Sequence, residues 1–82
     1  MNVKFKIISD QLRERRLELG VSQIDVARLS GLSLHSLSDI ETGKGNPTVE
    51  SLFKLLKVLG LEIRLEPSAG ETGDEQRPLE QP

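Results

Sequence analysis

Apolar and polar positions divide the chain into segments with two different periods. Residues 3–8 alternate, with Val3, Phe5 and Ile7 on one side and two lysines on the other, which predicts a short strand. Helical spacing follows over residues 10–19, 22–30, 34–42 and 49–59. Residues 61–66 alternate again and predict a second strand. From residue 67 onward the chain has almost no apolar content, which is typical of a disordered tail.

Hydroxyl residues and glycines mark where the predicted helices begin and end. A serine or threonine side chain at an N-cap accepts a hydrogen bond from a free N–H of the first helical turn. We expect this role for Ser9, Ser22, Ser33 and Thr48, each of which stands at the start of a helical segment. The glycines that follow the segments suit the left-handed conformation that often ends a helix.

Residues 23–40 have the spacing of a helix-turn-helix motif. Ala27 is small enough for a second helix to cross close over it, and Gly31 stands where the turn leaves the first helix. Leu37 and Ile40 share one face of the next helix and would hold it against the first. The opposite face of that helix is then free to enter a DNA major groove. The motif therefore predicts DNA binding.

Two observations leave open how the last part of the chain packs, within one chain or against a second copy. Apolar residues of the 49–59 helix cover an arc of roughly 220°, whereas a surface helix needs little more than about 100°. The excess would be covered by another subunit or by the last strand of the same chain. The strand at 61–66 also needs a partner, which would be residues 3–7 or the same strand of a twofold mate.

Charge and composition narrow the classes of function. Of the net charge of −2, the tail at 67–82 holds four acidic residues against one arginine, so residues 1–66 carry ten basic and nine acidic side chains. Attraction to phosphates should then be modest, and two copies per DNA site would help. The chain has no cysteine and one histidine, which argues against metal sites and disulfides. No phosphate-binding glycine loop or catalytic constellation is found, so we expect no enzyme activity and no cofactor.

Four sequence blocks now carry a resemblance to a known family. LRERR at 12–16, GVSQ at 20–23, VARLSGLS at 26–33 and IETGKGNP at 40–47 resemble the Cro/repressor-type (XRE) helix-turn-helix family. The resemblance implies an all-α, compact four- to five-helix repressor-like DNA-binding domain. It divides the chain into an N-terminal arm or short strand (1–7), the XRE domain (8–60), a C-terminal strand (61–66) and a disordered acidic tail (67–82).

The resemblance also implies roles for individual residues. Arg16 and Glu41 match the pair that joins the first helix to the third as a structural ion pair. Residues at the start of the second helix would face the DNA backbone, the third helix would supply base contacts, and the loop after it would reach phosphates. The third helix departs from the glutamine-rich pattern common in the family, so shape readout gains weight. The predicted DNA-binding residues are Ser22, Gln23, Ser33, Leu34, His35, Ser38, Asp39, Thr42, Lys44 and Asn46.

The segment LGLEIRLEP and the polar tail resemble HipB-type antitoxins. That resemblance implies a homodimer whose strands pair between subunits, and a protein that represses its own operon while it holds a kinase-like toxin. The predicted dimer interface consists of Leu55, Val58, Leu61, Ile63 and Leu65.

We therefore expect a cytoplasmic repressor that binds an inverted-repeat operator in double-stranded DNA as a homodimer, with no membrane segment and no metal. The narrower expectation is an antitoxin with a toxin partner. The first alternative is a stand-alone phage-type or metabolic regulator. The second alternative is a protein-interaction module that binds no DNA, because fold does not fix function.

Overall fold

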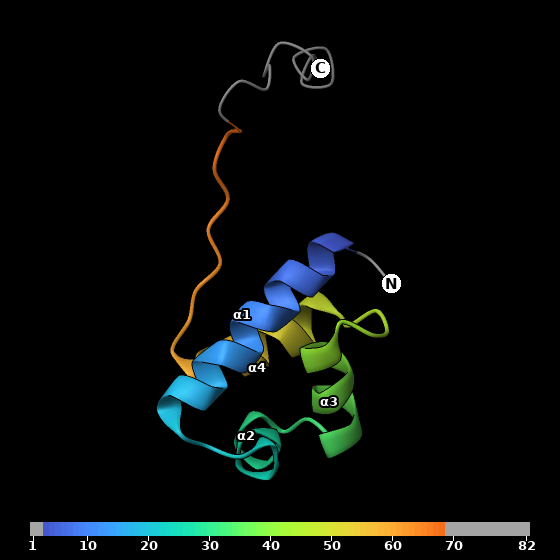
Figure 1. Ribbon diagram of the computed structural model, residues 1–82, viewed down its shortest axis with the longest axis vertical. Coiled ribbons are helices and arrows are strands. Elements are labelled where there is room, and N and C mark those ends of the chain that lie inside the picture. Colours follow the sequence, from blue (N-terminus) through green and yellow to red (C-terminus); the bar gives the residue numbers. More distant parts are fainter. Residues whose placement is uncertain (1–2, 69–82) are drawn as a thin grey trace.

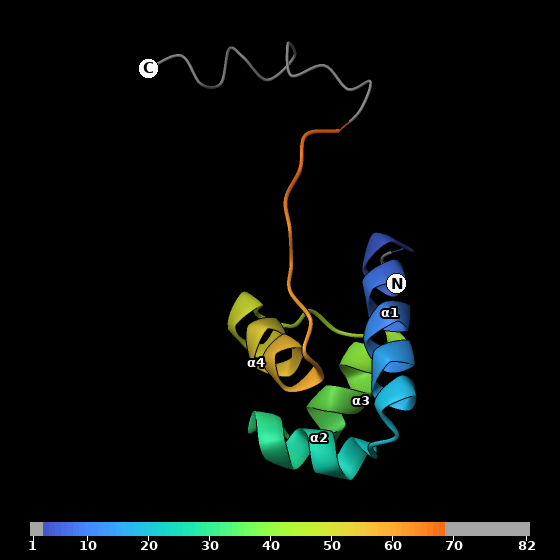
Figure 2. The ribbon, with the colours of Figure 1, turned by 90° about the vertical axis from the view of Figure 1, so that its left-hand side faces the viewer.

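The computed structural model describes residues 3–68 of the chain and contains four helices in that range. They are α1 (Val3–Leu19), α2 (Gln23–Ser30), α3 (Leu34–Thr42) and α4 (Val49–Leu59). α1 packs against α3 and α4, and α2 packs against the same two helices. Figures 1 and 2 show α2 at the lower end of the bundle, with α1, α3 and α4 above it. The predicted all-helical class is confirmed.

Three of the four predicted N-caps are present. The side chains of Ser22, Ser33 and Thr48 each accept a hydrogen bond from the backbone N–H three residues later. All three residues have extended backbone angles, as an N-cap requires. Because caps are local signals, they fix the starts of α2, α3 and α4 as the sequence predicts.

The core lies where the four helices meet. Leu37, Ile40 and Ala27 are all buried, in agreement with the helix-turn-helix spacing. The remaining buried apolar residues come from α1, α2 and α4 and are Leu12, Val26, Leu55, Leu56 and Leu59. Leu55 has no exposed surface within one chain. It belongs to the core cluster of the single chain, and its place in a dimer interface stays a prediction.

The short strand predicted at the N-terminus is wrong, because α1 begins at Val3 and includes residues 3–8. The six-residue alternation is too short to exclude a helix. The period of 3.6 appears only over a longer stretch, where Phe5, Ser9, Leu12 and Arg16 follow one face and lie toward the core. Ser9 is consequently a buried residue inside α1 and not its N-cap.

Residues 61–68 are extended but form no strand within the described part of the chain. Their predicted partner at residues 3–7 belongs to α1, and a single strand has no ladder to join. The C-terminal strand and its likeness to HipB-type antitoxins therefore have no support. Most of the predicted tail, residues 69–82, lies outside the described residues, as do residues 1–2. No helix between residues 3 and 68 is long and apolar enough to cross a membrane.

Candidate nucleic-acid interface

The turn between α2 and α3 is built from two short local contacts. Gly31 adopts φ +81°, and its N–H donates to the Ala27 carbonyl at 3.0 Å, which ends α2. The Leu32 N–H donates to Ser30 Oγ at 3.3 Å. Ser33 then caps α3, so the second helix of the motif begins three residues after the end of α2. This geometry places α3 across α2 with its polar side outward.

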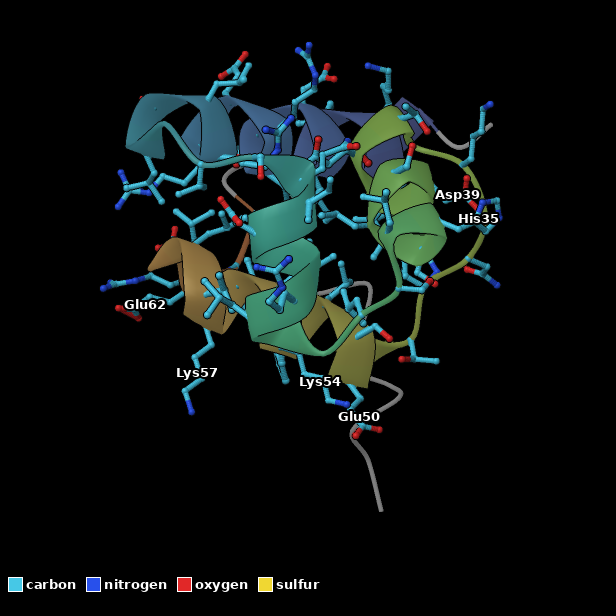
Figure 3. The ribbon with its side chains drawn as sticks, turned by 90° about the horizontal axis from the view of Figure 1, so that it is seen from below. His35, Asp39, Glu50, Lys54, Lys57 and Glu62 are labelled. Carbon is cyan, nitrogen blue, oxygen red and sulfur yellow. The ribbon has the colours of Figure 1, made fainter. Side chains whose placement is uncertain are left out.

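The outward side of α3 presents an imidazole beside a carboxylate. His35 is 87% exposed, and its Nε2 lies 3.3 Å from Oδ2 of Asp39 one turn later. Figure 3 shows the two side chains together at the outer edge of the bundle, on α3. Leu34 is exposed at the start of the same helix. A ligand approaching α3 therefore meets one apolar, one aromatic and one acidic side chain.

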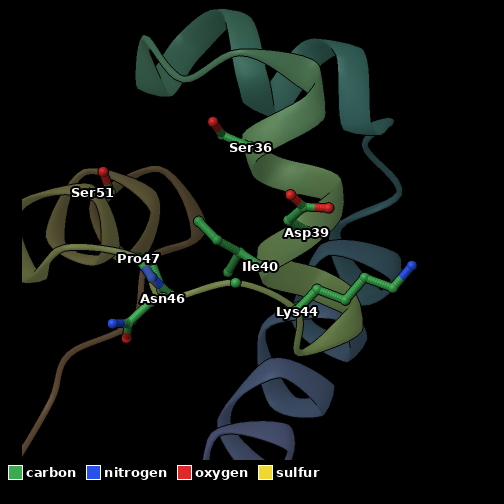
Figure 4. Close-up of a pocket in the computed structure, with 8 residues that line it drawn as sticks. Ser36, Asp39, Ile40, Lys44, Asn46, Pro47 and Ser51 are labelled. Atoms are coloured by element: carbon green, nitrogen blue, oxygen red, sulfur yellow. The ribbon is translucent and has the colours of Figure 1, made fainter. Parts of the chain in front are cut away.

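A hollow of about 200 Å³ lies between α3, the following loop and the start of α4. Its lining includes Asp39, Lys44 and Asn46 from the predicted set, together with Ser36, Pro47 and Ser51, for which no role in binding is predicted (Figure 4). Ser36 could have been found, because it follows Ser33 by three positions on the exposed face of α3. Ser51 could not, because it lies in the first turn of α4 and only the fold brings it to the same hollow as Ser36 and Asp39.

The loop after α3 holds Lys44 at the surface. Gly43 ends α3 with φ +78°, and the Lys44 N–H donates to the Asp39 carbonyl at 2.8 Å. The Lys44 side chain is exposed and points away from Asn46 and Ser51 (Figure 4). Its ammonium group is therefore free to meet a phosphate on the outer side of the loop.

The other predicted DNA-binding residues differ in how available they are. Ser22 is exposed, but its hydroxyl accepts the Asp25 N–H. The Ser33 hydroxyl donates to Ser36 Oγ, and Thr42 Oγ1 donates to the carbonyls of Ser38 and Asp39. These hydroxyls already serve the helices and retain only part of their hydrogen-bonding capacity for a ligand. Ser38 itself is half-buried.

A buried ionic network fixes α3 against α1. Arg16 donates from Nε to Glu41 Oε2 at 2.7 Å and from Nη2 to Glu41 Oε1 at 3.1 Å, and these are the two residues that the family resemblance pairs. Nη1 of the same arginine donates to the Val21 carbonyl at 2.9 Å. The Arg16 and Glu41 side chains are 10% and 1% exposed. Bidentate geometry of this kind restricts orientation as well as distance.

Gln23 belongs to this network. Its Nε2 donates to Glu41 Oε1 at 3.0 Å, and the side chain is half-buried. Gln23 is predicted to face the DNA backbone, and its contact with Glu41 is not foreseen from the sequence, since nothing in the local sequence places Glu41 within reach. The amide thereby links the start of α2 to the end of α3, on the two helices of the motif.

The remaining residues of the predicted dimer interface grow more exposed along the chain. Val58 and Leu61 are half-buried against the core, whereas Ile63 is 48% exposed and Leu65 is 93% exposed. A groove of about 370 Å³ runs between α1, α4 and residues 61–65. The apolar surface of this groove remains open in the single chain.

Comparison with known proteins identifies several that are similar to this chain. A family model described as Helix-turn-helix matches residues 12–65, from α1 to the extended segment. The HTH-type transcriptional regulator PuuR of Escherichia coli (strain K12) is 45% identical over 53 residues, which are 65% of this chain and 29% of PuuR. The chain thus spans less than a third of the length of PuuR.

Two further relatives are matched over most of their length. The uncharacterized HTH-type transcriptional regulator y4dJ of Sinorhizobium fredii (strain NBRC 101917 / NGR234) is 38% identical over 56 residues, which are 68% of this chain and 73% of y4dJ. The crystal structure of the restriction-modification controller protein C.AhdI from Aeromonas hydrophila superposes with a TM-score of 0.70 at 31% identity. That match covers 74% of this chain and 92% of C.AhdI.

Proposed function

Because this chain belongs to the XRE-type helix-turn-helix family, we propose that it is a DNA-binding transcriptional regulator that acts as a homodimeric repressor. The observation that carries the proposal is the exposed α3, locked to α1 by a buried ion pair while its outer side remains free. Two copies would place their α3 helices in successive major grooves, about 34 Å apart, on an inverted repeat.

Phosphate contacts would position the protein and α3 would read the bases. Lys44 supplies a free ammonium group at the loop, and the N–H groups at the start of α2 suit a phosphate. On α3, Leu34 can cover a thymine methyl, His35 can donate to guanine, and Asp39 can accept from cytosine N4. Serine hydroxyls that already cap helices add little, so DNA shape would contribute to specificity.

The test is a binding titration of the purified chain with the DNA upstream of its own gene, at two salt concentrations, against an unrelated duplex. Fluorescence anisotropy should show tight, salt-sensitive binding that prefers the upstream DNA. Lys44→Ala should weaken binding to both duplexes and reduce the salt slope by about one per copy. Lys57→Ala is the matched control, because Lys57 is exposed on α4, far from His35 (Figure 3).

The interaction-module alternative makes the opposite prediction. Equal, weak binding to both duplexes, unaffected by Lys44→Ala, would contradict the regulator proposal. Leu34 and Asp39 on the outer side of α3 would then be part of a protein-binding surface.

The antitoxin role is a narrower hypothesis that the regulator proposal does not need. It depended on a C-terminal strand, and residues 61–66 form none within the described chain. The relatives are transcriptional regulators by name. A neighbouring gene for a kinase-like toxin, and co-purification of its product with this chain, would favour the antitoxin role over a stand-alone regulator.

A further inference from the structure

One buried carboxylate joins three helices of the domain. Glu41, near the end of α3, accepts from Arg16 of α1 through both of its oxygens, at 2.7 and 3.1 Å. The amide nitrogen of Gln23, at the start of α2, donates to Oε1 of the same carboxylate at 3.0 Å. The Glu41 side chain is 1% exposed, so these three hydrogen bonds replace the water that a carboxylate would otherwise bind. The end of α3 is therefore held from α1 by a charged group and from α2 by a neutral amide.

The Gln23 amide retains hydrogen-bonding capacity beyond this contact. A carboxylate only accepts hydrogen bonds, so the NH₂ group of the amide must face Glu41, and that group has two N–H donors. One of them serves Glu41, and no residue between 3 and 68 accepts from the other. Gln23 is the first residue of α2, where the proposed function already places a DNA phosphate. The amide thus lies between the buried network and the DNA backbone.

The position of Glu41 matters for the residues beside it on α3. Asp39 lies two residues before Glu41 on the same helix, and the Lys44 N–H donates to the Asp39 carbonyl at 2.8 Å. A displacement at Glu41 would therefore also move the carboxylate that is proposed to read a base. Hydrogen bonds weaken steeply as their distance and angle depart from the optimum. The placement of the α3 end relative to α2 consequently affects discrimination between bases.

We propose that Gln23 is a positioning residue for base recognition and that it acts through Glu41. A DNA phosphate at the start of α2 would accept from the second N–H of the amide and hold the amide in the orientation that donates to Glu41. Contact with the DNA backbone would thereby fix the end of α3 where its side chains reach the bases. This inference rests on the proposed regulator and specifies how its phosphate contacts and its base contacts are coupled.

A glutamine that only contacted a phosphate would behave differently. Phosphate contacts carry no sequence information, so their loss weakens binding to every duplex to the same extent. Loss of a residue that positions α3 instead weakens binding to the preferred DNA more than binding to an unrelated duplex. The preference ratio, defined as the dissociation constant of the unrelated duplex divided by that of the upstream duplex, therefore separates the two roles.

Gln23→Met tests the proposal, because methionine is unbranched and has no N–H donor. Fluorescence anisotropy should show that the preference ratio of this variant falls by about tenfold relative to the wild-type chain. Lys44→Ala should leave the ratio unchanged. Gln11→Met is the matched control, since Gln11 is exposed on α1 and has no hydrogen-bond partner within the described residues. An unchanged ratio in Gln23→Met, with circular dichroism showing that the variant is folded, would overturn the proposal.

A second measurement uses the wild-type chain and does not depend on the folding of a variant. Solvent exchange of side-chain amide protons, measured by NMR, should be slower for Gln23 than for Gln11, because the Gln23 amide donates to a buried carboxylate. Addition of the upstream duplex should slow the exchange at Gln23 further and shift the backbone amide signal of Glu41. Exchange at Gln23 as fast as at Gln11, or no response of Glu41 to the duplex, would overturn the proposal.

The failure of this inference differs from the failure of the proposed function. If the wild-type chain prefers its upstream DNA and Gln23→Met keeps the wild-type preference ratio, only the positioning role of Gln23 is wrong. If the wild-type chain prefers neither duplex, the regulator proposal is wrong, and the positioning role is overturned with it.

Discussion

Arg16 and Glu41 show how a single pair of charges can position a whole helix. Both side chains are withdrawn from water, and the pair is completed by Val21 and Gln23. Such a pair often stabilises a fold no more than apolar residues of similar size would. Loss of one partner is costly, however, because it leaves the other charge buried and unpaired. Its value here is orientation, because it holds the end of α3 against α1 while the outer face stays free.

We expect Glu41→Ala to lower the free energy of unfolding by about 3–5 kcal/mol, because Arg16 would remain buried without its partner. Urea denaturation monitored by circular dichroism measures the change. Glu50→Ala is the control, since Glu50 is 81% exposed beside Lys54 and should change stability by less than about 1 kcal/mol. Wild-type stability of Glu41→Ala would contradict this role.

Asp39 is the residue whose replacement should change specificity without unfolding the domain. Its carboxylate is 36% exposed and lies beside His35. A carboxylate accepts from cytosine N4, whereas an asparagine amide pairs with adenine, with about 1–3 kcal/mol of discrimination per base.

Selection from random DNA should therefore give a cytosine preference with the wild-type chain that Asp39→Asn moves toward adenine. Identical selected sequences would show that Asp39 does not read a base. An unchanged melting temperature is the control for folding.

At the scale of the element, a small residue has a different role in α1 and in the turn before α3. Ser9 is fully buried inside α1, and its Oγ has no hydrogen-bond partner within the described residues. Gly31, by contrast, is exposed and needed only for its backbone angle. Each makes a separate prediction about stability.

Ser9→Ala should raise the free energy of unfolding by about 1 kcal/mol, because it removes an unpaired buried hydroxyl and favours the helix. Ser22→Ala should lower it by about 1 kcal/mol, because that hydroxyl caps α2. Thermal denaturation of both variants checks the contrast, and a loss of stability in Ser9→Ala would show that the hydroxyl has a partner.

Gly31→Ala should cost about 1–2 kcal/mol through backbone conformation alone. A Cβ atom at Gly31 would meet nothing within 4 Å, so no clash contributes. Gly31→Asn should cost less, because asparagine tolerates the left-handed region better than alanine. Equal losses in urea denaturation would contradict this explanation.

For the whole molecule, the small net charge means that affinity for DNA depends on how many copies bind one site. Residues 1–66 carry ten basic and nine acidic side chains, so one copy has little general attraction to phosphates. Two copies on one inverted repeat would add their phosphate contacts, and the dimer would fix the spacing of their α3 helices.

Binding to an inverted repeat should therefore depend on helical phase. Inserting about five base pairs between the half-sites should abolish cooperative binding, and inserting about ten should restore part of it. Electrophoretic mobility shifts with the three duplexes measure this. Cooperative binding to all three would rule out a rigidly spaced dimer.

The sequence by itself determined the parts of this protein that depend on neighbours in the chain. The caps at Ser22, Ser33 and Thr48 and the turn at Gly31 act over three or four residues, so their effect can be derived without a fold. The burial of Leu37 and Ile40 followed from the same short spacing.

Only the tertiary structure decided the rest. Whether residues 3–8 form a strand or a helix depends on the surface that covers them, and here the line from Phe5 to Arg16 packs on the core as a helix. Gln23 contacts Glu41, which lies far from it in sequence. Leu55 is buried in a core built from several helices, and Ser51 lines the same hollow as Ser36 on α3. Long-range packing of this kind has no local signal, because it arises only once the helices have met.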